Sequence, residues 1–172
     1  MDFMIRDVRP EEYATLGELT ARAYLDDGHL LQGEDDWYFG HLKNVAGRAE
    51  VADVLVAVAR DEADGAVLGG VTFVPAPGVM GDRAEAGETE IRMLAVAPAA
   101  RGRGVGEALV RACVDRARAV PGCVRIVLST QTGMRTAHRI YERLGFGRAP
   151  ERDWSPIPER PEFRLLCYTL EL

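Results

Sequence analysis

Two arginines and three glycines lie within six residues of one another in this chain. They are Arg101, Gly102, Arg103, Gly104 and Gly106. The apolar run before them ends at Pro98, and a helix-like stretch follows them. A loop that enters a helix exposes unpaired backbone N–H groups at the positive end of the helix dipole. Glycine lets the backbone approach an anion closely, and arginine adds charge-assisted hydrogen bonds. The segment therefore predicts a site for a phosphate-bearing ligand, the alternative being an ordinary tight turn with solvated arginines.

Two common nucleotide-binding patterns do not fit this loop. The dinucleotide fingerprint GxGxxG places a third glycine where this chain has Glu107, and no acidic residue ends the next expected strand. The triphosphate-binding loop requires glycine followed by lysine, a pair that the sequence lacks. We therefore expect neither a nicotinamide or flavin dinucleotide nor a nucleoside triphosphate.

The elements that must position this loop alternate between strand and helix periods. The expected strands cover residues 3–8, 53–60, 66–75, 89–98, 124–130 and 162–172. Helical stripes follow Pro10, Val105 and Met134, and a further helix is expected near residues 34–46. Three successive strands without a helix between them imply antiparallel pairing. The prediction is an α/β fold with a mixed sheet.

Composition limits the remaining classes of protein. The 172-residue chain is 47% hydrophobic, enough for one sizeable core, so we expect a single domain over residues 1–172. The formal net charge of −6 disfavours nucleic-acid binding. No stretch is long and apolar enough to span a membrane, and residues 1–10 lack the plan of a signal peptide, so we expect a cytoplasmic protein. The cysteines and histidines show neither disulfide nor zinc spacing, so we expect no metal.

The segment from Arg101 to Gly106 resembles the [RQ]-x-x-G-x-[GA] signature of the GNAT superfamily, the acetyl-CoA-dependent N-acetyltransferases. The segment "RIYERLGF" (139–146) is similar to a helix and turn of the same family, and the expected element order is the family order. The resemblance covers nearly the whole chain. It implies a mixed, mostly antiparallel sheet of about six or seven strands flanked by about four helices. It also implies acetyl-CoA as the co-substrate.

Acetyl transfer to an amine requires a base and an acid, because an alkylamine with a pKa of about 10 is protonated at neutral pH. Glu90 stands where GNAT histone acetyltransferases carry the glutamate that takes the proton of the amine. The alternative for Glu90 is a solvent-facing carboxylate, and Glu88 is the reserve base. Tyr141 stands where the family places a general acid for the departing thiolate, although its position on an apolar stripe is equally typical of a core tyrosine.

The resemblance further implies a coenzyme site along one strand and the loop after it. Leu94, Ala95 and Val96 would line the thioester and the pantetheine arm. The loop would hold the pyrophosphate through Arg101, Gly102, Arg103, Gly104, Val105, Gly106 and Glu107. Met134 departs from the pattern, since many members carry an asparagine there that contacts the pantetheine. Ser129 or Thr130 would then supply that polar contact.

Two segments are expected to shape the acceptor pocket. Five acidic residues, which either attract a cationic amine or cap helix starts, are Asp26, Asp27, Glu34, Asp35 and Asp36. The proline-rich segment 148–163 forms the other expected wall, where Trp154 either covers the acceptor or seals the edge of the core.

Together these features favour an enzyme that acetylates a small-molecule primary amine by direct attack in a ternary complex. No cysteine has a recognisable base partner for a covalent intermediate. Two alternatives stay open: the acceptor is a lysine or the N-terminus of a protein, or the chain is a non-catalytic acyl-CoA sensor. The apolar final strand favours a homodimer.

Overall fold

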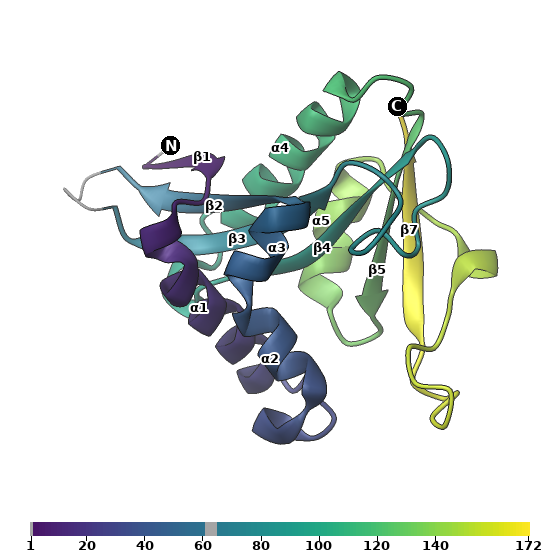
Figure 1. Ribbon diagram of the computed structural model, residues 1–172, viewed down its shortest axis with the longest axis horizontal. Helices are drawn as coiled ribbons and strands as arrows, with labels where there is room; N and C mark the ends of the chain where they lie inside the picture. Colours follow the sequence, from purple (N-terminus) through teal and green to yellow (C-terminus); the bar gives the residue numbers. More distant parts are fainter. Residues whose placement is uncertain (1, 61–64) are drawn as a thin grey trace.

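The computed structural model describes residues 2–60 and 65–172, and within them the chain forms one seven-stranded sheet (Figure 1). The strands are β1 (Phe3–Asp7), β2 (Asp53–Ala59), β3 (Val67–Val74), β4 (Glu88–Val96), β5 (Arg125–Gln131), β6 (Gly147–Arg148) and β7 (Leu165–Glu171). Their spatial order is β1-β2-β3-β4-β5-β7-β6. The β4–β5 pair is parallel and every other pair is antiparallel. The predicted mixed, mostly antiparallel sheet is confirmed.

Five α-helices in the described residues cover the two faces of this sheet (Figure 1). They are α1 (Tyr13–Asp26), α2 (Trp37–Lys43), α3 (Val45–Val51), α4 (Val105–Ala119) and α5 (Arg135–Arg143). Alternation along β2 shows the two layers, because Val54 and Val56 join a cluster with Leu16 of α1, whereas Leu55 belongs to the main cluster under α4. Helices α1 to α3 therefore lie on one face, and α4 and α5 on the other.

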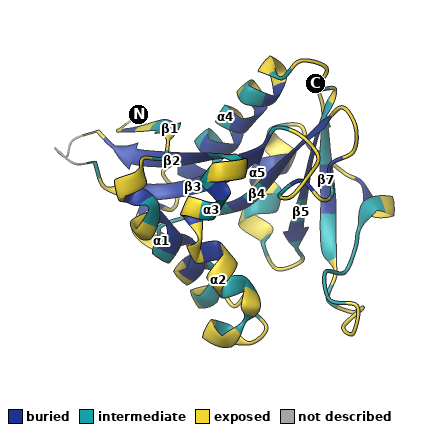
Figure 2. Ribbon diagram, in the orientation of Figure 1, coloured by how far each residue is buried: buried dark blue, intermediate teal, exposed yellow. Residues whose placement is uncertain are grey.

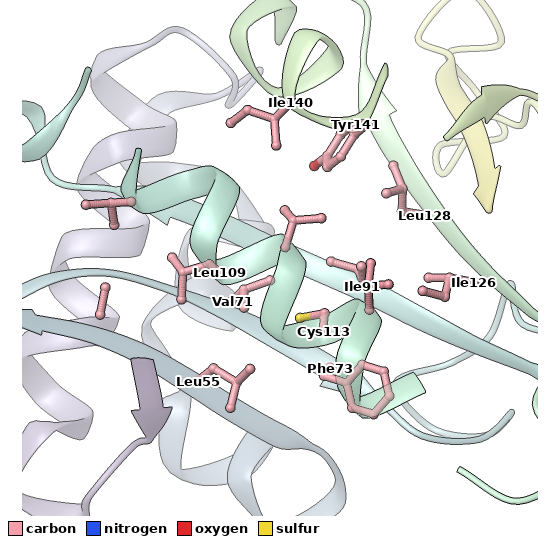
Figure 3. Close-up of a cluster of buried hydrophobic side chains, with 14 of the residues drawn as sticks. Leu55, Val71, Phe73, Ile91, Leu109, Cys113, Ile126, Leu128, Ile140 and Tyr141 are labelled. Atoms are coloured by element: carbon pink, nitrogen blue, oxygen red, sulfur yellow. The ribbon is translucent and has the colours of Figure 1, made fainter. Parts of the chain in front are cut away.

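The main core lies between the sheet and the α4–α5 layer. Leu109 and Cys113 of α4 are fully buried against Val71 and Ile91 of the central strands (Figure 3). The central strands are buried along most of their length, whereas the outer faces of the helices are exposed (Figure 2). This packing fixes β4 and the start of α4 relative to each other.

The helix expected near residues 34–46 is divided in two. Asn44 ends α2 and also begins α3, with φ −81° and ψ 67°, outside the helical region. Its side chain accepts a hydrogen bond of 3.0 Å from the Gly47 amide, as an N-cap does. The connection between the expected strands 53–60 and 66–75 lies mainly outside the described residues.

Candidate active site

Strands β4 and β5 pair only over their first halves. Glu88–Ile91 pair with Arg125–Leu128, after which β4 stays with β3 and β5 stays with β7. Just past this point lies Met93, the one non-glycine residue with positive φ (56°) in the described chain, beside a register shift between β3 and β4. Met93 packs on the α1–α2 side, although simple alternation from Ile91 would turn it toward α4. A bulge therefore accompanies the separation of β4 from β5.

Two cavities meet at this separation. The first, called here the Glu90 cavity, has a volume of about 280 Å³ and is bordered by Glu90–Met93 of β4 and Ser129–Gln131 of β5. The second, called here the glycine-loop groove, has a volume of about 880 Å³ and is bordered by Leu94, Ala95 and Val96 and by the loop before α4. Both are lined by Tyr24, His29 and Met134. Strand β4 thus runs from one cavity into the other.

Glu90 lies at the wall of the first cavity and is only 2% exposed, so it is not a solvent-facing carboxylate. Its Oε2 accepts hydrogen bonds from the backbone amides of Arg83 (3.2 Å) and Ala84 (3.1 Å). Burial raises the pKa of Glu90 to about 7, against the opposing effects of Arg92 and of these amides. A carboxyl with this pKa exchanges protons near neutral pH, as a general base must.

Glu88 has a different environment, although it lies on the same strand. Arg152 donates to both of its carboxylate oxygens at 2.8 and 2.9 Å, and Arg125 donates to Oε1 at 3.0 Å. Burial favours the neutral acid, but these bonds and the Glu85 amide outweigh it and lower the pKa of Glu88 to about 2. Glu88 lines neither cavity, and its ion pairs commit it to holding the structure.

The glycine loop has the geometry expected of an anion site. Gly102 and Gly104 have φ of 77° and 81°, values that favour glycine, and Gly104 is the N-cap of α4. Within the described residues no hydrogen bond is donated by the amides of Gly102 to Gly104, and the first amides of α4 lack partners as in any helix. These amides are available to an anion in the groove.

The two loop arginines have different surroundings. Arg101 lines the groove and forms a two-pronged ion pair with Asp27, at 3.2 and 2.8 Å. Arg103 pairs with Asp2 and is not among the residues that line the groove. Glu107 lines the groove and is paired with Arg111 and Arg143.

Three more arginines border the groove and were missed by the sequence analysis. Arg135, Arg139 and Arg143 of α5 are exposed and line it opposite the loop. Their spacing of four residues places them on one helical face, a signal that the sequence contained. Together with Arg101 they make the groove locally basic in an acidic protein.

Tyr141 lies in the core cluster next to Ile140 and Leu128 and lines neither cavity (Figure 3). Its ring is 5.8 Å from those of Phe146 and Tyr168, and burial raises its pKa. Its hydroxyl has no hydrogen-bond partner in the described chain, where the Arg48 Nε is the one fully buried side-chain nitrogen or oxygen without a partner. The Tyr141 hydroxyl therefore keeps some solvent contact.

The expected pantetheine contact is placed differently from the prediction. Thr130 lines the Glu90 cavity and not the groove, and its hydroxyl donates to the Met134 Sδ at 3.6 Å. Ser129 also lines that cavity, and its Oγ accepts a 2.9 Å hydrogen bond from Trp154 Nε1. Both hydroxyls therefore already have sulfur or indole partners.

Besides β4 and β5, both segments that were expected to shape the acceptor pocket contribute to the wall of the Glu90 cavity. Trp154 and Phe163 line it from the C-terminal segment, and Trp37 and Tyr38 from α2. Of the five acidic residues, only Asp36 lines this cavity, and it caps α2 by accepting from the Tyr38 amide at 2.9 Å. Helix capping and ion pairing thus account for most of this acidic cluster.

In the described ranges, no group of three or more His, Cys, Asp or Glu side chains is arranged to hold a metal ion. No helix there has the length and apolar character needed to cross a membrane.

The sequence matches the acetyltransferase (GNAT) family over residues 14–146. No curated protein matches the sequence. Among solved structures, yncA of Salmonella typhimurium with its cofactor acetyl-CoA superposes with a TM-score of 0.71 at 21% identity, covering 100% of this chain and 95% of that one. NAA60 of Arabidopsis thaliana in complex with a bisubstrate analogue superposes with a TM-score of 0.73 at 19% sequence identity, and the match covers 98% of this chain and 97% of that one. A phosphinothricin acetyltransferase of Sinorhizobium meliloti in complex with acetyl-CoA superposes with a TM-score of 0.71 at 17% sequence identity, and the match covers 100% of this chain and 89% of that one.

Proposed function

The chain belongs to the GNAT acetyltransferase family, and from this premise we propose that it transfers an acetyl group from acetyl-CoA to the primary amine of a small molecule. One observation carries the proposal. Glu90, a buried carboxyl whose pKa is raised to about 7, lines a cavity that adjoins a basic groove.

The groove suits a coenzyme with several phosphates. The unpartnered amides after Arg101 suit a pyrophosphate, and the arginines of α5 suit a further phosphate. From Leu94 to Val96, β4 has no strand partner on its β5 side in the described chain. An extended pantetheine arm can bind the backbone groups on that side through its amides, much as a neighbouring strand would. Two structures similar to this chain contain acetyl-CoA.

The proposed reaction proceeds by direct attack in a ternary complex. Glu90 accepts a proton from the ammonium form of the acceptor, and the neutral nitrogen attacks the acetyl carbonyl carbon. The carbon–nitrogen bond forms as the carbon–sulfur bond breaks, and the thiolate of CoA leaves. A backbone N–H on the unpaired part of β4 stabilises the charge on the carbonyl oxygen. The products are the N-acetylated amine and CoA.

We assign protonation of the thiolate to Tyr141 on the family resemblance. Its hydroxyl has no partner in the described chain and keeps some solvent contact, so it is free to donate. Tyr24 is a second phenol to consider, because it lines both cavities at their junction. Burial raises the pKa of both phenols, which keeps them protonated at neutral pH.

The size of the Glu90 cavity supports a small acceptor. About 280 Å³ is at the lower end of the usual size of small-molecule sites, and Trp154 and Phe163 wall it off on the C-terminal side. The similar S. meliloti structure is of a phosphinothricin acetyltransferase.

The test is to mix the protein with acetyl-CoA and a panel of small amines, to follow the release of the CoA thiol, and to identify the product by mass. We expect at least one amine to gain an acetyl group, and Glu90→Gln to slow the reaction strongly. Acetyl-CoA binding without turnover of any amine would contradict this function and favour the sensor. Acetylation of peptides but of no small amine would show that the acceptor is a lysine or the N-terminus of a protein.

We further propose a cytoplasmic homodimer paired through β7. On the edge of β7 away from β5, β6 pairs with Thr169 and Tyr168, and Trp154 bridges Leu165. In the described chain this leaves the end of β7, residues 170–171, for another strand. Light scattering checks this point, since a monomer mass at micromolar concentration would contradict it.

A further inference from the structure

Arg92 is the only arginine or lysine among the described residues that line the Glu90 cavity. It follows Glu90 by two residues on β4, so both side chains lie on the same face of the strand. Its Nη1 donates to the Met80 carbonyl oxygen at 3.0 Å, and no carboxylate in the described chain forms an ion pair with it. The guanidinium therefore retains donors for a ligand.

A second guanidinium lies behind this wall. Arg48 is 5% exposed, and its Nη1 donates to the carbonyl oxygens of His41 (2.6 Å) and Leu42 (3.1 Å) at the end of α2. Its Nε has no partner, and no described carboxylate pairs with it. Burial lowers the pKa of Arg48, and the charge of Arg92 lowers it further. The two arginines thus lie near each other, and neither forms a direct ion pair with a described carboxylate.

A phenol and two carboxylates act on Arg92 without forming an ion pair with it. The Tyr38 hydroxyl and the charges of Glu90 and Asp82 favour the charged form of Arg92, against the effect of burial. Asp36, the other acid in the cavity wall, is occupied by the amides of Tyr38 and Gln32. A buried charge without a direct ion-pair partner is costly, so an anion bound to Arg92 would stabilise this arrangement.

We propose that the acceptor is a zwitterion of the amino-acid class, whose acidic group binds Arg92 while its amine faces Glu90. The inference rests on the proposed function and narrows its acceptor. Side chains two residues apart on a strand are separated by about 7 Å, a span that a small amino acid can bridge with hydrogen bonds at each end. Arg92 is then a specificity-determining residue and Glu90 the base.

The experiment compares each standard L-amino acid with its own α-amide, because the pair keeps the amine and the side chain and differs in the charge of the acid. We expect kcat/KM for the accepted amino acids to exceed that of their amides by about tenfold or more. Arg92→Met keeps much of the length of the side chain and removes its charge, so it should lower the acid-to-amide ratio to about one. Arg92→Lys keeps the charge and should retain part of the preference for the acid. Arg111→Met on the exposed face of α4 is the matched control and should keep the ratio.

Acetyl-CoA binding to the Arg92 variants, measured by calorimetry, should remain at the wild-type value and shows that they are folded. If the amides react as well as the acids in the wild-type protein, the inference is wrong while the proposed function stands. An acid-to-amide ratio that survives Arg92→Met would also overturn it, since a group other than Arg92 would then recognise the acid. No acetylation of any amine would instead contradict the proposed function.

Discussion

Glu88 and Glu90 lie two residues apart on β4 and are both almost completely buried, yet the pKa of one is about 2 and that of the other about 7. The difference comes from their partners. Glu88 accepts from two guanidinium groups, whereas Glu90 accepts only from backbone amides. Opposite shifts in two neighbouring carboxyls separate a structural acid from one suited to proton transfer.

The first prediction concerns the pH dependence of turnover. Glu90 must be ionised to accept a proton, so kcat/KM should rise with pH and level off above about pH 7. Glu90→Gln should lower kcat by about 100-fold and remove this dependence. Steady-state rates from pH 5.5 to 9 over a range of acceptor concentrations check it, and Glu85→Gln is the control, because Glu85 is exposed. A profile that keeps its midpoint in Glu90→Gln would rule Glu90 out as the titrating group.

The second prediction uses the same carboxyl as a determinant of stability. The pKa of Glu90 is about 7 in the folded protein and 4.5 in the reference state, so the folded protein binds the proton more tightly. Its contribution to stability is therefore largest below pH 4.5 and is lost as the pH rises to about 7. Glu90→Gln avoids this loss, and its advantage over the wild type should grow by up to about 3 kcal/mol between pH 5 and pH 8. Urea unfolding at both pH values measures the difference, and a constant difference would contradict the raised pKa.

Much of the fold could be predicted because the strand and helix periods alternate clearly along the chain. The break between α2 and α3 at Asn44 could not be predicted, because one polar residue inside a short helical stretch does not show that its side chain caps a new helix. The glycine loop was predictable because its geometry is local. The partner of Arg103 was not, because Asp2 lies 101 residues away in the sequence.

The burial of Glu90 depends on a contact that no local pattern reveals. Its carboxylate is held by the amides of Arg83 and Ala84, and the carbonyl oxygen of Arg83 accepts from Arg152 of the C-terminal segment. The guanidinium of Arg83 lies 4.5 Å from the ring of Trp154. The environment of the base is thus assembled from two distant parts of the chain, residues 83–90 and the C-terminal segment that holds Arg152 and Trp154. The single-domain organisation, the site residues, the cytoplasmic location and the homodimer stay predictions.

The third prediction separates the arginines at the groove. Arg139→Ala should weaken acetyl-CoA binding by about tenfold, because Arg139 lines the groove and has no ion pair in the described residues. Arg103→Ala should change binding little, because Arg103 pairs with Asp2 outside the groove lining. Calorimetric titration with acetyl-CoA measures both, and dephospho-CoA shows whether Arg139 acts on the 3′-phosphate. Stronger weakening in Arg103→Ala than in Arg139→Ala would show that the loop rearranges around the ligand.

The fourth prediction decides which phenol protonates the leaving thiolate. Tyr141→Phe removes a hydroxyl that has no hydrogen-bond partner in the described chain, so the fold should keep its stability while kcat falls by about 100-fold with both substrates saturating. Tyr24→Phe is the matched variant, because Tyr24 lines both cavities, and its kcat should fall by less than about tenfold. An acetyl donor made from a CoA analogue with a more acidic thiol should lose less activity in Tyr141→Phe. The reverse ranking of the two variants would assign the acid to Tyr24, which its position at the junction of the cavities would explain.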